Sequence, residues 1–545
     1  MARELKLMAA LMLLITAAGT GTARAEVLES REAEPVVLTG SETPKLLGVA
    51  PGDVVAFAWF EGWNRVPDGW VPTPVQVDER KLIDYRDFRR STSGGTGGFT
   101  ALGYADPATD GHGLDANDEI SMMAFDAGLP AGDRQPPPGV DPDTRTSVTI
   151  TDPLDPGQHA YVYLFARTGD LPQDAGYDLV DYRPDSGLTT ARYDLGIRNR
   201  WQINRLTIAA AEGPDVDILD GDKFNTTGSG CEESELAFSR DGGGYAARID
   251  GPVRAIRSVV GAGDDQFARR DYTFYEGMFE TRTILDDVSG PRRVISALDF
   301  SARAIGATYR NSANQAGVKV DGNPDVLDRG PAGWEQVSGP QGSLTSVSRL
   351  VSAPPGAGLS TFQEDEALPP AGSPMLCSGD AHAYGAAGPE VDLPGTGSAG
   401  ADRFEMVRKT WLDGPEAGPD LGQLRSRQVN NPLRSEVGRT EPAILVARAI
   451  PARISIRPGE SRTIRVVVRN HGQRKAKSVR FCSRQKSRTR CRATRAIASG
   501  RALTRKMTIR AGRNAKLGPE ILWVKAKARK SFTYPGRISI RVKPR

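Results

Sequence analysis

The chain has 545 residues, and its 71 Lys and Arg against 67 Asp and Glu leave a formal net charge of only +4. After the N-terminus no segment is both apolar and long enough to span a bilayer as a helix, for which about 20 residues are needed. Phosphate-binding loops, zinc signatures and a G-x-S-x-G nucleophile motif are also absent from the sequence. These absences argue against a membrane-spanning mature chain and against the enzyme classes that those motifs mark.

The first 25 residues have the features of a secretory signal peptide. Arg3 and Lys6 precede the apolar run 7–18, which is too short for a membrane helix, and the segment ends with small residues at 23 and 25. A charged start, a short apolar run and an A-x-A site are typical of segments that signal peptidase removes. We therefore expect residues 1–25 to be cleaved and the mature protein to be secreted or held at the cell envelope, without a transmembrane segment.

Residues 26–445 are rich in Gly and Pro, and strand patterns are frequent there while sustained helical periodicity is absent. The region is too long for one ordinary domain, since domains typically have about 50–250 residues. The Pro-rich stretch 134–145 suggests a boundary between an N-terminal β region, 26–145, and a central β-sandwich region, 146–445. Ala, Gly, Pro and Ser dominate 353–401, which we expect to be a loop excursion from the central region.

Aromatic side chains cluster in FAWFEGWNRVPDGW, residues 57–70. Trp63 and Trp70 lie in its Gly- and Pro-containing part and could form an exposed platform for sugar rings, although aromatic clusters more often belong to a core. A second group of candidate ligand-binding residues comes from GPVRAIR and TYRN. It is formed by Arg254, Arg257, Tyr309 and Arg310.

Two short acidic stretches could supply paired carboxylates for acid–base catalysis. PVQVDERK contains Asp78 and Glu79, and DANDE contains Asp118 and Glu119. Glycosidases use two carboxyl groups about 5–10 Å apart. Arg80 directly follows Asp78 and Glu79, so an ordinary salt-bridged strand end is the alternative interpretation.

The loop before the strand at ISMMAF, residues 120–125, is rich in oxygen ligands and is a candidate calcium site. A standard EF-hand is excluded because Ile120 stands where the loop needs Gly. A looser cage remains possible, with an acidic turn as the alternative, and His112 lies in the same loop. The candidate ligands are Asp106, Asp110, Asp115 and Asn117.

Four cysteines are present, an even number that favours disulfides in an exported chain. Cys482 and Cys491 flank a basic turn as two neighbouring strand ends would, so they are expected to pair. Cys231 and Cys377 are then left to pair with each other or to remain free thiols.

Residues 446–545 form a region of opposite charge. From residue 448 onward there are 30 Lys and Arg but two acids, Glu460 and Glu520, so the rest of the chain is strongly acidic. The bases alternate with apolar residues at the two-residue period of strands, which predicts a C-terminal immunoglobulin-like β-sandwich. The run RTIRVVVRNHGQRKAKSVRFC resembles bacterial extracellular modules called CARDB, which implies this fold and an accessory role.

The sequence therefore predicts an all-β protein with a large β-sandwich-rich region followed by an immunoglobulin-like domain. Phrases such as VPTPVQVDERK and LDANDEISMMAFDAG resemble those of exported bacterial proteins without a named activity. The leading hypothesis is non-catalytic binding of carbohydrate or an envelope polymer, with the basic domain binding polyanions. Sequence-specific nucleic-acid binding is not expected, because stacking aromatics are few among the basic strands. The alternatives are a carbohydrate-active hydrolase or lyase and a structural adhesion or scaffold protein.

Overall fold

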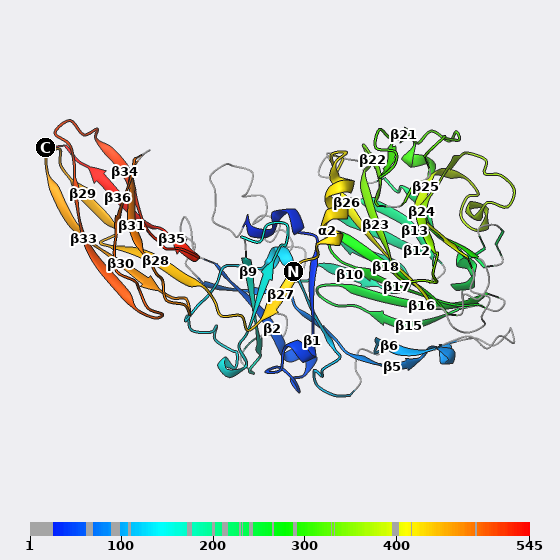
Figure 1. The fold of residues 1–545 in the computed structure, drawn as a ribbon, viewed down its shortest axis with the longest axis horizontal. Coiled ribbons are helices and arrows are strands. Elements are labelled where there is room, and N and C mark those ends of the chain that lie inside the picture. The colour runs from blue at the N-terminus through cyan, green and yellow to red at the C-terminus, as the bar shows by residue number, and fades with distance from the viewer. Residues whose placement is uncertain are drawn as a thin grey trace.

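The computed structural model is built almost entirely from antiparallel strands, so the predicted all-β class is confirmed (Figure 1). Within the described part of the chain α2 (Leu421–Asn430) is the one α-helix, and no helix there is long and apolar enough to cross a membrane. The predicted signal peptide lies outside the described residues. These are 26–60, 69–88, 99–106, 111–157, 159–169, 171, 177–198, 202–209, 216–227, 230–231, 233–238, 243–263, 266–286, 292–328, 330–331, 333–394, 403–415, 417–485 and 488–544.

The first body consists of two sheets packed face to face and a separate hairpin. A three-stranded sheet has the order β1 (Pro35–Thr39), β7 (Glu119–Met123), β4 (Gln76–Asp78). A five-stranded sheet has the order β27 (Arg434–Val437), β8 (Thr146–Thr151), β9 (His159–Ala166), β2 (Val54–Phe60), β3 (Gly69–Thr73). Alternate apolar residues of both sheets form the core between them, among them Leu38, Ile120, Val148, Val162 and Leu164. The hairpin is formed by β5 (Arg80–Asp84) and β6 (Thr100–Tyr104).

The central body is a large sandwich that shares one hydrophobic core. Its nine-stranded sheet has the order β15 (Gly244–Ile249), β16 (Ala255–Gly263), β17 (Gln266–Phe274), β18 (Met278–Asp286), β26 (Phe404–Asp413), β23 (Gly342–Ser352), β22 (Glu335–Gly339), β20 (Thr308–Asn311), β21 (Val318–Lys319). Against it lie a four-stranded sheet, β14 (Leu219–Asn225), β19 (Arg292–Phe300), β25 (Ala383–Leu393), β24 (Gly358–Glu366), and a second one, β10 (Val180–Arg183), β11 (Gly187–Thr190), β12 (Tyr193–Arg198), β13 (Gln202–Ile208).

The segment 353–401 is not the loop excursion that its composition suggests, because it contains strands β24 and β25. A glycine is needed at Gly388 in β25, where the neighbouring strand β19 approaches closely. A Cβ added at Gly388 would lie 2.2 Å from the carbonyl oxygen of Ser296. At this position the linker-like composition is therefore a packing requirement of an inner strand.

Replacing Gly388 by Ala should lower the free energy of unfolding by about 1–3 kcal/mol, since the new methyl group overlaps fixed backbone atoms. Urea denaturation measures the change. Gly358→Ala in the adjacent strand β24 is the matched control, because a Cβ there meets nothing within 4 Å. A Gly388→Ala protein as stable as the control would contradict the close approach of the two strands.

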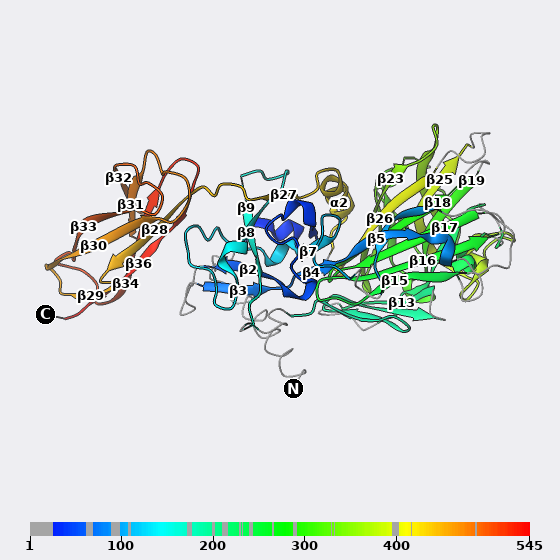
Figure 2. The ribbon, with the colours of Figure 1, turned by 90° about the horizontal axis from the view of Figure 1, so that it is seen from below.

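Residues 443–542 form a two-sheet sandwich at one end of the molecule (Figures 1 and 2). One sheet has the order β33 (Ala502–Arg510), β30 (Ser461–Asn470), β28 (Ala443–Ile450), β35 (Ser531–Tyr534). The other has the order β29 (Arg453–Ile456), β36 (Gly536–Val542), β34 (Gly518–Lys527), β31 (Arg480–Gln485), β32 (Arg488–Ala493). The apolar residues of the period-two pattern are buried between the sheets and the bases that alternate with them are exposed, as at Ile464 and Arg465.

The chain leaves the first body after β9, builds the central body, and returns to the first body at β27. Strand β27 pairs with β8 antiparallel, with Val437 opposite Val148. The boundary that the sequence suggests at 145/146 therefore does not separate two units, because strands from both sides of it share one sheet. The Pro-rich stretch 134–145 is a connection within the first body.

Both cysteine pairs form disulfides. Cys482 and Cys491 lie directly opposite each other on β31 and β32, with their Cα atoms 4.1 Å apart. Cys231 pairs with Cys377 at a Cα separation of 5.2 Å. Such bonds persist in oxidising, extracytoplasmic compartments.

Candidate functional site

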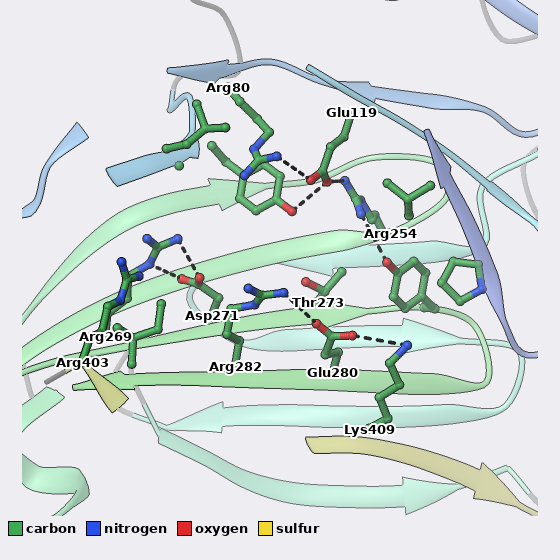
Figure 3. A pocket seen from close by; sticks show the side chains of 17 residues that line it. Arg80, Glu119, Arg254, Arg269, Asp271, Thr273, Glu280, Arg282, Arg403 and Lys409 are labelled. Carbon is green, nitrogen blue, oxygen red and sulfur yellow. Dashed lines mark hydrogen bonds and ion pairs between the residues drawn. The ribbon is translucent and has the colours of Figure 1, made fainter. Parts of the chain in front are cut away.

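A cavity of about 360 Å³ lies between the first body and the outer face of the nine-stranded sheet (Figure 3). Its upper wall comes from β1, hairpin β5–β6 and Glu119 of β7, and its floor comes from β17, β18 and β26. The residues that line it are Pro35, Val37, Arg80, Leu102, Gly103, Tyr104, Glu119, Arg254, Arg269, Asp271, Thr273, Tyr275, Glu280, Arg282, Ile284, Arg403 and Lys409.

Strand alternation places the charged floor residues at the cavity. On β17, Asp271 and Thr273 line the cavity. Arg270, which precedes Asp271, and Tyr272, which lies between the two, contact Asp222 inside the sandwich. Successive side chains of a strand point to opposite faces of its sheet. A single strand therefore supplies one charged network to the core and another to the cavity.

The upper wall is organised by the buried guanidinium of Arg254. It bonds Asp78 through Nε and Nη2 at 2.9 and 2.7 Å, and Glu119 through Nη2 at 2.7 Å. Arg80 donates to the other oxygen of Glu119 at 2.8 Å, and the Tyr104 hydroxyl donates to Glu119 at 2.9 Å. Strands β4 and β7 of the first body are therefore tied to Arg254, next to β16 of the central sheet, by charge-assisted hydrogen bonds.

The floor carries a second set of ion pairs. Arg282 bonds Glu405 at 2.6 Å, and Lys409 lies 3.6 Å from Glu280. Arg269 pairs with Asp271 at 2.6 Å. Neighbouring charges alternate in sign along the floor. Their ion pairs therefore hold the floor side chains in place in the absence of a ligand.

Three of the cations that line the cavity reach solvent more than its acids do, whereas Arg254 and Arg269 are buried. The side chains of Arg282, Arg403 and Lys409 are 43, 40 and 32 % exposed. Those of Glu280 and Glu119 are 23 and 15 % exposed. An incoming molecule therefore meets guanidinium and ammonium groups first, which favours an anionic ligand.

The electrostatics of the upper wall keep Glu119 ionised. Burial alone would raise the pKa of Glu119, but the Arg254 and Arg80 guanidiniums outweigh it and hold the pKa below its ordinary value. Burial raises the pKa of Tyr104 well above its ordinary value, so this phenol stays protonated and donates to Glu119. Glu119 accepts hydrogen bonds here and does not carry a proton for transfer.

The structure places the predicted carboxylates on adjacent strands, with Asp78 of β4 directly opposite Glu119 of β7. Their contacts match the salt-bridge alternative, with Arg254 as the bridging base. Asp118 accepts from the backbone N–H groups of Arg80 and Asp115 at 2.8 and 2.7 Å, which fixes the turn before β7. Glu79 is buried.

The second group of predicted ligand residues is not brought together. Five strands lie between β16 and β20 in the nine-stranded sheet, so Arg254 and Arg257 are remote from Tyr309 and Arg310. Arg257 is fully buried beside the rings of Tyr245 and Tyr272, and Tyr309 is fully buried with its hydroxyl on Glu335. Arg310 donates to Ser338 at 3.2 Å. Of the four, Arg254 lines the cavity.

Trp63 lies outside the described residues. Trp70 lies on β3 of the first body, in an aromatic cluster that also contacts the C-terminal sandwich. Trp70 makes edge contacts with Trp59 and Tyr163, and its indole donates to the carbonyl of Gln135 at 2.6 Å. Ile444 of β28 joins the same cluster. These contacts match the core interpretation of Trp70.

The candidate calcium loop is held by its own side chains where it is described. Asp115 accepts from the backbone and side-chain nitrogens of Asn117 at 2.8 and 2.7 Å, while Asp106 accepts from the backbone of Arg248 at 3.0 Å. Asp110 lies outside the described residues, and among those described no three His, Cys, Asp or Glu form a metal-binding group. His112 is exposed in the turn.

Sequence reasoning missed the floor of the cavity. The signal is present as charged residues at a two-residue spacing, such as Glu280 and Arg282 or Arg269 and Asp271, but these residues lie outside the strands that the sequence predicted. That spacing shows that the residues share a face. It does not show which part of the chain covers that face.

No known protein family and no curated protein matches the sequence. Among solved structures, a Niemann-Pick type C2 protein from the Japanese carpenter ant is similar at 8 % identity and a TM-score of 0.15, covering 19 % of this chain and 96 % of that one. An α-mannosidase from Enterococcus faecalis is similar at 8 % identity and a TM-score of 0.36, with 88 % of this chain aligned. The chain spans about half of the mannosidase, 55 % of its length. At these TM-scores neither likeness decides fold or function.

Proposed function

We propose that the protein is a secreted, non-catalytic binding protein of the bacterial cell surface whose ligand is an anionic carbohydrate or envelope polymer. The observation that carries this proposal is the greater exposure of Arg282, Arg403 and Lys409 than of the acids beside them in the cavity. Guanidinium groups recognise carboxylate and phosphate groups with two parallel hydrogen bonds. The proposed binding site is therefore the cavity, and no longer the loop that contains Trp63 and Trp70.

The state of the carboxylates supports binding over hydrolysis. A general acid must hold a proton near the working pH. Glu119, the candidate carboxylate that lines the cavity, has its pKa lowered by Arg254 and Arg80 against the effect of burial. We therefore keep the hydrolase or lyase as the alternative that the experiment must exclude.

The C-terminal sandwich is proposed as an accessory module of the CARDB type that binds polyanions. Its exposed strand positions carry bases, for example Arg465 and Arg469 on β30 and Arg537 and Arg541 on β36. Such a surface attracts a charged polymer over a distance set by salt, about 8 Å at physiological ionic strength. Binding through this module should therefore weaken as salt rises.

The experiment compares binding to acidic and neutral polysaccharides on an array. Arg282→Ala with Lys409→Ala should weaken binding of the acidic polymers about tenfold or more, since each charge-assisted hydrogen bond contributes roughly 1.5–3 kcal/mol. The matched control is Arg349→Ala with Lys319→Ala, which removes the same charges from exposed positions of the same body outside the cavity. The control should bind as the wild type does.

Three results would contradict the proposal. Equal loss in both double variants would show that the cavity has no special role. Release of fragments from any polymer by the wild type would establish an enzyme. Absence of binding to every polymer at low salt would favour the adhesion or scaffold alternative.

A further inference from the structure

A second ionic cluster lies on the opposite side of the central body, on the outer face of the sheet β14-β19-β25-β24. It is independent of the proposed binding site. Lys223 of β14 and Asp299 of β19 occupy adjacent antiparallel strands, and the residue opposite Asp299 is Gly221. The two side chains therefore meet diagonally on one face, and both are fully buried. Asp222, between Gly221 and Lys223, points the other way to Arg408.

The amine of Lys223 is held against two acids. Its Nζ lies 3.3 Å from Oδ2 of Asp299 and 3.9 Å from Oε1 of Glu235. It donates to the carbonyl oxygens of Met375 and Ser378 at 2.9 and 2.5 Å. The segment η10 (Pro374–Cys377), which the disulfide to Cys231 fixes, closes the cluster from outside.

Glu235 is also fixed in position. It begins the short helix η8 (Glu235–Phe238), and its side chain is 3 % exposed. One oxygen accepts from the backbone N–H of Phe224 at 3.2 Å, and the other accepts from the hydroxyl of Ser378. The carboxyl group is thereby aimed at the amine.

Asp299 is not accommodated as an ordinary ionised partner. Apart from the ion pair with Lys223, neither of its carboxyl oxygens has a hydrogen-bond donor among the described residues, although both are buried. Burial raises the pKa of Asp299 well above its ordinary value, more than Lys223 lowers it. A buried carboxylate without donors would cost several kcal/mol. Burial therefore favours the protonated form of the Asp299 carboxyl group.

We propose that Lys223 and Asp299 form an intramolecular amide bond. The Nζ lone pair attacks Cγ of Asp299, the Nζ–Cγ bond forms, the bond from Cγ to one oxygen breaks, and one water molecule leaves. Glu235 takes a proton from the amine and returns it to the departing hydroxyl group. No oxidant, metal or activated co-reactant is needed for this condensation, and the structure already holds Nζ of Lys223 3.3 Å from a carboxyl oxygen of Asp299.

The product suits its surroundings better than the separate groups do. An amide replaces an amine and a carboxyl whose oxygens have no donor besides that amine, and its remaining N–H can donate to the carbonyl of Met375 or Ser378. The bond would join β14 to β19 covalently, beside the disulfide of Cys231 and Cys377. A cross-link between distant residues stabilises a fold mainly by restricting the unfolded chain.

The deciding measurement is the intact mass of the purified mature protein. The expected mass lies one water molecule below that of the chain with its two disulfides. Protease digestion should yield a branched peptide that joins the segments around Lys223 and Asp299 and survives reduction. A wild-type protein at full mass would overturn the proposal.

Two variants test the role of Glu235. Glu235→Gln keeps the side-chain volume but cannot shuttle the proton, so the variant should have the full mass. Glu233→Gln is the control, because Glu233 lies in the same segment but bonds Thr226 and Arg292. The control should retain the mass deficit. A mass deficit in Glu235→Gln would overturn the assignment of Glu235 as the proton carrier, and circular dichroism checks that each variant is folded.

Discussion

Arg254→Met is expected to lower the free energy of unfolding by about 3–5 kcal/mol, because it leaves Asp78 and Glu119 buried without their shared cation. The Arg254 side chain is 3 % exposed and the Asp78 side chain is fully buried. Methionine fills much of the same volume, so the loss reports charge and hydrogen bonding more than packing. Urea denaturation of the full chain measures it.

The control is Arg248→Ala, in the neighbouring strand β15. Arg248 pairs with Asp106 at 3.7 Å, but its side chain is 41 % exposed. Ion pairs at that exposure contribute at most about 1 kcal/mol. If the two variants were equally stable, the bridge between the first body and the central sheet would not contribute to stability as the geometry predicts.

Glu335→Gln is expected to remove a pH dependence of stability. Glu335 is buried in the central core, where it accepts from the Tyr309 hydroxyl at 2.9 Å. Burial raises the pKa of Glu335 from 4.5 to about 7, against smaller lowering by Tyr309 and Arg408. The folded state therefore keeps a proton that the unfolded chain has lost between about pH 4.5 and pH 7.

Protonation of Glu335 stabilises the folded state, so stability falls as the pH rises. The stability that the protonated Glu335 contributes is fully present below about pH 4.5 and is lost as the pH rises through about 7. A shift of this size corresponds to roughly 3 kcal/mol. The stability of Glu335→Gln relative to wild type should rise by that amount between pH 4.5 and pH 8, as urea titrations would show.

The control is Glu436→Gln, because the Glu436 side chain is 53 % exposed. This variant should differ from wild type by about 0.5 kcal/mol or less at every pH. A constant difference for Glu335→Gln would contradict the raised pKa.

The C-terminal sandwich could be predicted because its pattern is local. Apolar residues such as Ile464, Val466 and Val468 alternate with bases, and the structure buries the former and exposes the bases. Strand β25 could not be predicted in the same way. Gly388 is required there because β19 lies close to it, and a sequence does not record which strand will be its neighbour.

The cavity could not be predicted from the sequence for the same reason. Glu119 and Arg254 are bonded to each other, yet 135 residues separate them along the chain. The acidic residues were recognised from local spacing, whereas the base that neutralises them was assigned to a different site. Long-range pairing, and not residue type, decides whether a carboxylate is catalytic or structural.

The return of the chain at β27 governs the order in which the protein can fold. Strand β8 has β9 on one side, and its other edge is covered by β27, which follows the whole central body in sequence. During synthesis that edge stays open until residue 437 has emerged, and an open strand edge invites pairing with another chain. Strand β27 can therefore cover this edge only after the whole central body has been synthesised.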